Sequence, residues 1–236
     1  MELSILWRRT WLCAIFLLHG AVAWAARPMM TDDANVVDPH ACQNESWIRW
    51  GQTSTEKWTV PGCNLGGDTE VSVGANFLSE QDRSSQRLGL LQFKKRWKVV
   101  EPGQWGLSTT VGKVQSISNR PDAVVVSDTY VNVPITWQSS QGPVLHLNLG
   151  AYHHQAERVT HATWGVGGEF PLNPSLFAIM ETFGETGSRS KVQLGLRYWV
   201  VPQAVQIDTT WGQDVQGPSN SRWISMGLRL LTPALY

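Results

Sequence analysis

The sequence predicts an all-β fold, a transmembrane up-and-down antiparallel β-barrel of about 12 strands with both termini on the periplasmic side. Three observations predict it. The N-terminus has the pattern of a secretory signal, about twelve segments alternate apolar with polar or small residues, and the links between them alternate in length. The 13 tryptophans, in a chain with only 16% charged residues, fit a barrel with aromatic girdles.

Residues 1–25 have the three parts of a signal peptide. Arg8 and Arg9 precede an apolar run at residues 11–18, and Ala23-Trp24-Ala25 provides a small-residue cleavage site. We therefore expect export to the cell outer membrane of a Gram-negative bacterium. Residues 26–41 are expected to form a periplasmic N-terminal segment, acting as a plug or a tether, and residues 42–236 to form the barrel.

The alternating segments define the predicted strands. Most of them have the roughly 9–11 residues that cross a bilayer at the tilt of a barrel strand, and the second is the shortest. The segments are 42–51, 55–61, 68–78, 86–98, 103–116, 126–139, 142–153, 159–170, 174–184, 190–201, 203–212 and 221–232.

The links between these segments predict the orientation of the barrel. Turn-rich links at 101–103, 140–143, 171–174 and 202–203 are short. Longer polar links fall between them, at 79–85, 116–123, 155–159, 186–190 and 213–221. Short periplasmic turns and longer extracellular loops are typical of outer-membrane barrels, and an even number of strands then places both termini in the periplasm.

The two faces of each segment differ in polarity. Between residues 191 and 200, for example, Val192, Leu194 and Leu196 share the face opposite Gln193 and Arg197. A soluble sandwich alternates in the same way, with its apolar face inward. The leader, the link lengths and the terminal aromatic residue favour an outward apolar face in contact with lipid. Five tryptophans near strand ends are expected at the membrane interfaces: Trp105, Trp137, Trp164, Trp211 and Trp223.

Two cysteines follow the leader, Cys42 and Cys63. Cys42 opens the first predicted strand and Cys63 follows the second, so an antiparallel hairpin returns both to one rim of the barrel. In an oxidising periplasm this arrangement predicts a disulfide, with two unpaired thiols as the alternative.

Several charges fall on the inward face of the predicted strands, where ionised groups avoid hydrocarbon. Their signs alternate between neighbouring strands from Glu181 to Arg229, which predicts cross-strand ion pairs. These charges either form structural salt bridges that fill a narrow barrel or line a solute path. The candidates for controlling permeation are Lys94, Arg96, Glu169, Glu181, Arg197, Asp208 and Arg229.

No other chemistry is indicated. Asp32, Asp33, Asp38 and His40 have no spacing that fixes a metal geometry, so we expect no metal and no cofactor. No His-x-Ser arrangement or nucleophile elbow is present, so an enzyme is not expected. We interpret the histidines at 153, 154 and 161 as a polar loop cluster, with a catalytic or metal role as the alternative.

One resemblance adds to this interpretation. Arg27-Pro28, then Thr31-Asp32-Asp33-Ala34, then Cys42-Gln43 and Glu45, resemble the opening of outer-membrane proteins grouped under the meta-pathway of phenol degradation. Residues 181–185 and 193–198 resemble the final strands of that family. The resemblance implies an outer-membrane barrel that admits hydrophobic or aromatic solutes.

The sequence therefore predicts a passive channel or facilitator for small, hydrophobic or aromatic solutes. The expected partners are outer-membrane lipid and the solute, with no nucleic acid because the formal net charge is zero, and the expected state is a monomer. The alternatives are a closed structural or adhesive barrel that binds through its extracellular loops, and a lipid-modifying outer-membrane enzyme.

Overall fold

A computed structural model describes residues 29–81, 85–117, 127–140 and 142–235. The expected signal peptide, Arg27-Pro28, most of the link at 116–123 and the terminal Tyr236 lie outside these residues.

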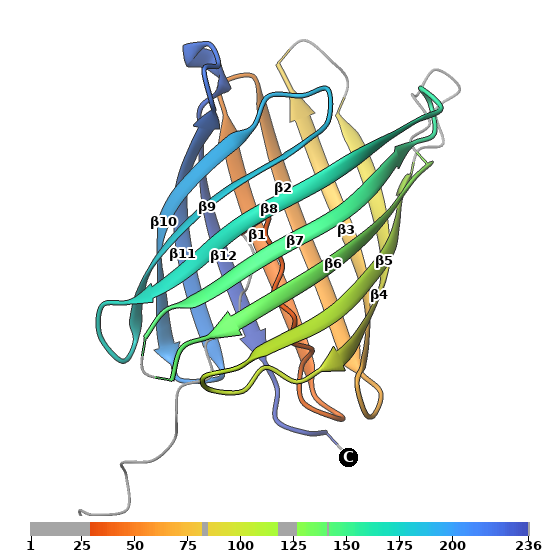
Figure 1. Ribbon diagram of the computed structural model, residues 1–236. Helices are drawn as coiled ribbons and strands as arrows, with labels where there is room; N and C mark the ends of the chain where they lie inside the picture. The colour runs from red at the N-terminus through yellow and green to blue at the C-terminus, as the bar shows by residue number, and fades with distance from the viewer. Residues whose placement is uncertain (1–28, 82–84, 118–126, 141, 236) are drawn as a thin grey trace, which may run out of the picture.

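The described residues form twelve antiparallel strands in one closed barrel, which confirms the predicted fold class (Figure 1). Each strand pairs with its neighbours in sequence, and β1 closes the barrel by pairing with β12. The strands are β1 (Cys42–Gly51), β2 (Ser54–Asn64), β3 (Thr69–Glu80), β4 (Gln86–Lys98), β5 (Trp105–Ser116), β6 (Ser127–Gln138), β7 (Val144–His154), β8 (Val159–Pro171), β9 (Leu176–Glu185), β10 (Lys191–Val201), β11 (Val205–Asp214) and β12 (Trp223–Leu231).

The second strand differs from its prediction. β2 has 11 residues and continues through Pro61 to Asn64, whereas the pattern predicted only 55–61. Pro61 has no backbone N–H, and the ladder to β3 is interrupted there, between the pairs Thr59–Ala75 and Gly62–Ser72. The proline therefore weakens one ladder without ending the strand.

The barrel has two different rims. We call the end where β1 begins and β12 ends the terminal rim, and the opposite end the loop rim. The two longest connections, 117–126 and 215–222, lie at the loop rim, but the β1–β2 connection there has only residues 52–53. The loop rim also carries a 3-10 turn, Ser219–Ser221. Among the described residues, no helix is long and apolar enough to cross a membrane.

The outward face is apolar and the inward face is polar, the reverse of a soluble sandwich. On β10, Leu194 is 50% exposed while Arg197 is 1% exposed. One of the five tryptophans expected at the membrane interfaces lies elsewhere: Trp223 is buried inside the barrel, where its indole donates a hydrogen bond to the Gln193 side chain at 2.9 Å. It shares its parity with the inward-facing Ser225, so position near a strand end did not determine its direction.

The predicted disulfide is present. Cys42 and Cys63 lie directly opposite each other in the β1–β2 ladder, with their Cα atoms 4.0 Å apart. Cys63 lies within β2 rather than after it, because that strand is longer than predicted. The bond fixes the first hairpin at the terminal rim.

Candidate functional site

Residues 29–41 run inside the barrel, from about its middle to the terminal rim, and we call them the inner segment (Figure 1). They are irregular in structure and mostly buried, with Ala34, Val36 and Val37 at most 1% exposed. A turn, closed by a hydrogen bond from the backbone N–H of Ala41 to the carbonyl of Asp38, connects the inner segment to β1.

The part of the inner segment farthest from the terminal rim is bound through its backbone by side chains of two strands. The carboxylate of Glu181 on β9 accepts hydrogen bonds from the backbone N–H groups of Met30 and Thr31, at 2.9 and 2.7 Å. The Asn148 side chain on β7 accepts one from the N–H of Asp32 at 2.8 Å and donates one to its carbonyl at 2.7 Å. Buried backbone groups need such partners, which here come from the barrel wall.

The remaining part is held in the same way by other strands. Thr136 on β6 accepts a hydrogen bond from the N–H of Ala34 at 2.8 Å, and Glu70 on β3 accepts one from Val37 at 3.0 Å. Asn64 on β2 donates to the carbonyl of Val37 at 2.8 Å. Side chains from five strands therefore bind a single irregular peptide inside the lumen.

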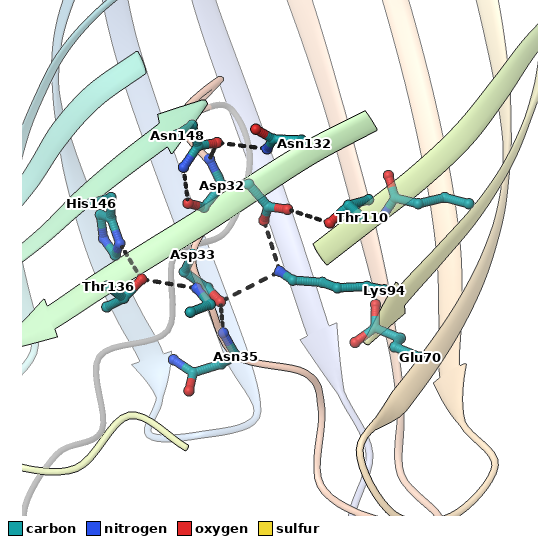
Figure 2. A network of polar contacts seen from close by, with 12 residues as sticks. Asp32, Asp33, Asn35, Glu70, Lys94, Thr110, Asn132, Thr136, His146 and Asn148 are labelled. Carbon is teal, nitrogen blue, oxygen red and sulfur yellow. Dashed lines mark hydrogen bonds and ion pairs between the residues drawn. The ribbon is translucent and has the colours of Figure 1, made fainter. Parts of the chain in front are cut away.

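Ion pairs add to these backbone contacts (Figure 2). The ammonium group of Lys94 on β4 lies 2.9 Å from an Asp32 carboxylate oxygen and 3.6 Å from one of Asp33. Burial raises the pKa of Asp33 above its ordinary value, and the nearby Lys94 opposes this shift. Two inward glycines on β8 make room for the inner segment. A Cβ at Gly165 would lie 2.8 Å from Thr31 Oγ1, and one at Gly167 would lie 2.8 Å from Met29 Cε.

Three of the predicted lumen charges form a buried group in the terminal half of the barrel. The guanidinium of Arg197 lies 2.6 Å from a Glu169 carboxylate oxygen and 3.7 Å from one of Asp208. His146 Nε2 lies 3.2 Å from the other Glu169 oxygen and its Nδ1 lies 2.9 Å from the Thr136 hydroxyl. The Arg197–Asp208 pair joins neighbouring strands, whereas the Glu169–Arg197 pair spans the intervening β9.

The other predicted charges have separate partners. Arg229 lies 3.6 Å from Glu45 on β1, and Arg96 lies 2.6 Å from Asp68 in the β2–β3 turn. Glu181 binds the inner segment and accepts a hydrogen bond from the Gln193 side chain, so the expected alternating ladder does not begin there.

A cavity of about 490 Å³ occupies the lumen between the inner segment and the loop rim, and Met30 and Asp32 lie at its floor. Its wall includes Leu90, which belongs to a buried cluster of inward apolar side chains, and Trp58 and Tyr130, which pack against that cluster. Trp58 stacks on Trp47 with ring centroids 5.7 Å apart, and Tyr130 stacks on Tyr152 at 6.0 Å.

None of the seven predicted permeation residues lines this cavity. Lys94 and Arg229 border a second cavity of about 30 Å³, which lies between the inner segment and the wall and is large enough for a water molecule. Sequence reasoning missed the aromatic wall. The available signal was that Trp58 and Tyr130 are aromatic residues on the inward parity of their strands.

The histidines of the predicted loop cluster do not all lie together. His154 lines the mouth of the cavity, with Nδ1 3.5 Å from Asp128 and Nε2 3.7 Å from Glu185. The His161 ring lies 5.4 Å from that of His154, whereas His153 contacts the Thr160 hydroxyl instead. No group of three or more potential ligands in the described part of the chain is arranged to hold a metal ion.

The chain matches one protein family and is similar in fold to outer-membrane barrels of known structure. The family model described as "Uncharacterised conserved protein UCP029691" matches residues 13–231. No curated protein matches the chain. Several solved structures are similar to it in fold, including an outer-membrane channel and two porins. The COG4313 outer membrane channel from Pseudomonas putida F1 has a TM-score of 0.63 at 11% identity, covering 85% of this chain and 98% of that one. A KdgM porin in complex with disordered oligogalacturonate has a TM-score of 0.61 at 8% identity, covering 80% and 98%. The NanC porin has a TM-score of 0.54 at 12% identity, covering 81% and 98%.

Proposed function

This chain belongs to the family described as "Uncharacterised conserved protein UCP029691", and from its barrel and cavity we propose that it is a passive outer-membrane channel for small solutes. The inverted polarity of the wall supports insertion in a bilayer, because apolar side chains cover the outside and charges lie within. Structures that are similar to this chain in fold include an outer-membrane channel and two porins. In this proposal the leader directs export, the loop rim faces outward, both termini are periplasmic and the protein works as a monomer in outer-membrane lipid.

The main support for this proposal is the cavity in the loop half of the barrel. It is as large as a typical small-molecule site, and it ends on the inner segment rather than on a wall strand. A solute that enters from the loop rim therefore reaches a floor made of a peptide tethered to β1. Passage requires this peptide to move towards the terminal rim, while the tether allows it to return.

The lining of the cavity suggests the class of solute. Trp58, Tyr130, Tyr152 and Phe183 offer aromatic faces, while Asn132 and Asn148 offer amide groups. Stacking on aromatic rings favours planar apolar solutes, and the amides provide hydrogen bonds for a polar substituent. We therefore propose small hydrophobic or aromatic solutes that carry a polar group, in agreement with the resemblance to the meta-pathway family.

Single-channel recording on the refolded full-length mature protein tests the proposal. Deleting residues 29–37 removes the floor of the cavity but keeps the turn before β1, and it should convert a closed or rarely open barrel into one of steady conductance. Glu185→Gln is the control, because Glu185 borders the cavity near the loop rim, where it lies 3.7 Å from His154 and accepts a hydrogen bond from the Ser188 hydroxyl. Because a deletion can disturb folding, a point variant provides a second test. Glu181→Gln weakens the hydrogen bonds that Glu181 accepts from the backbone of Met30 and Thr31, and it should also raise the open fraction of the channel. Equal and negligible conductance in all the variants contradicts a channel.

The filled terminal half of the barrel favours a second candidate, a closed barrel that acts through its extracellular loops. In that case the inner segment is a permanent part of the core, and the wild-type protein shows no openings under any solute gradient. Liposome swelling by a panel of small aromatic solutes separates the two candidates, because only the channel gives solute-dependent swelling.

A further inference from the structure

The charges on the outside of the barrel are few, of one sign and confined to one sector. Among the described residues, the outward positions of the twelve strands carry no aspartate or glutamate. They carry five basic side chains, all on β2, β4 and β5: Lys57, Arg87, Lys95, Lys98 and Lys113. Lys98 faces outward because of the β-bulge after Arg96, and its ammonium group lies 3.8 Å over the outward Trp105 ring. On the other strands, outward positions are apolar, small or uncharged polar, so this sector is the exception that needs an explanation.

Three of the five lie towards the loop rim. Lys57 is three residues after the start of β2, Arg87 is the second residue of β4, and Lys113 is three residues before the end of β5. All three are exposed. Lys95 and Lys98 lie at the other end of β4, near the terminal rim, and Lys95 is opposite Thr69 and Thr109.

The register brings the loop-rim cations close to one another. Lys57 is opposite Phe77 in the β2–β3 ladder, and Phe77 is opposite Arg87 in the β3–β4 ladder. The two cations therefore stand on either side of one outward aromatic ring, separated by two strand spacings, or roughly 10 Å. Lys113 extends the patch to β5, beside the exposed Leu91 that it opposes. We call Lys57, Arg87 and Lys113 the basic patch.

Cations next to apolar side chains on an outer wall are costly in hydrocarbon, and they become favourable where their heads reach an anionic interface. We propose that the basic patch binds the phosphate groups of lipid A in the outer leaflet, while Phe77 and Leu91 contact the acyl chains. Lysine and arginine provide charge-assisted hydrogen bonds to phosphate oxygens, and the absence of outward carboxylates in the described strands leaves nothing on the wall to repel them. The inference rests on the proposed location of the protein in the outer membrane, with its loop rim facing outward.

Binding of lipid A to the refolded full-length mature protein in detergent tests the inference without any measurement of transport. The probe is bisphosphorylated lipid A, titrated against the wild type, the triple variant Lys57→Gln/Arg87→Gln/Lys113→Gln and the control Lys95→Gln. Attraction of about 1 kcal/mol for each surface cation predicts at least tenfold weaker binding by the triple variant and little change for Lys95→Gln. Heat-modified gel mobility confirms that each variant is folded, and the exposed sites make misfolding unexpected.

Two further titrations identify the source of the phosphate. Dephosphorylated lipid A should bind the wild type as weakly as bisphosphorylated lipid A binds the triple variant, and millimolar inorganic phosphate should not displace the lipid. Equal binding of the two forms of lipid A, an equal loss in Lys95→Gln, or displacement by inorganic phosphate overturns the inference. A channel without lipid A affinity and a lipid-binding barrel without conductance are different results, so failure here is distinguishable from failure of the proposed function.

Discussion

The two halves of the lumen follow the same wall pattern but have opposite contents. In the terminal half, inward side chains meet the inner segment and one another, leaving a cavity of about 30 Å³. In the loop half, aromatic and amide side chains surround about 490 Å³. Period-two alternation is the same in both, so it determines which side chains point inward and not whether they meet a partner.

The difference has an energetic consequence. Buried charges in the terminal half are compensated by partners on other strands, as with Arg197 on β10 between Glu169 on β8 and Asp208 on β11. Charged pairs near the loop rim are partly exposed, and Lys191 lies 3.9 Å from Asp214 with 37% of its side chain accessible. Substitutions should therefore affect stability in the terminal half, and solute access in the loop half.

Removal of Arg197 should produce the largest effect. Arg197→Met leaves Glu169 and Asp208 buried without their cation, which typically costs about 3–5 kcal/mol in the free energy of unfolding. The matched change near the loop rim, Lys191→Met, should cost about 0–1 kcal/mol, because that pair is partly solvated. Denaturant unfolding in lipid vesicles, followed by tryptophan fluorescence, measures both. Equal losses would contradict the contrast between the halves.

The disulfide at the terminal rim should come next. Cys42→Ser/Cys63→Ser opens a closed loop with a sequence separation of 21, and it should lower the free energy of unfolding by about 3 kcal/mol. The free energy of unfolding of both proteins is measured with and without reductant. Reductant should lower it for the wild type and leave it unchanged for the double variant, which has no disulfide. The wild type should retain its fold after reduction because the β1–β2 ladder is unchanged.

A smaller effect is expected where the two halves meet. Asn148→Ala removes two hydrogen bonds to the backbone of Asp32, together about 2 kcal/mol of attachment for the inner segment. The open fraction in single-channel records should rise accordingly. Asn132→Ala is the control, since Asn132 donates to Asn148 and does not bind the inner segment directly. A rise of the same size in Asn132→Ala would mean that the cavity wall, rather than the attachment, controls opening.

The smallest effect should come from the Asp68–Arg96 pair at the terminal rim. The hydrogen bond from Arg96 lowers the pKa of Asp68, so the pair stabilises the fold at pH values above the ordinary Asp pKa of about 3.9. This contribution is lost as the pH falls through the lowered value. Thermal melting of the wild type and Asp68→Asn should differ slightly near neutral pH and converge in acid. A difference that grows with acidification would show that another group is responsible.

Most of the barrel could be predicted because strand formation and facing depend on local patterns. Eleven predicted strands agree with the observed bounds to within about two residues, and β2 failed only where Pro61 obscured its continuation. The cysteine pairing followed from the same hairpin geometry. The direction of Trp223 could also have been read from its parity, which is a stronger signal than closeness to a strand end.

The sequence by itself determined the number of strands, the apolar outside and the inward direction of Glu169, Arg197 and Asp208, because each follows from a period of two residues along one strand. Only the tertiary structure decided the course of the inner segment, the partners of those charges and the position of the cavity. Residues 29–41 have no repeating pattern, and the side chains that hold their backbone, such as Asn148 and Glu181, lie more than 100 residues away in the chain. Closure of the barrel brings them together, so their contacts depend on the packing of the whole wall rather than on any local signal.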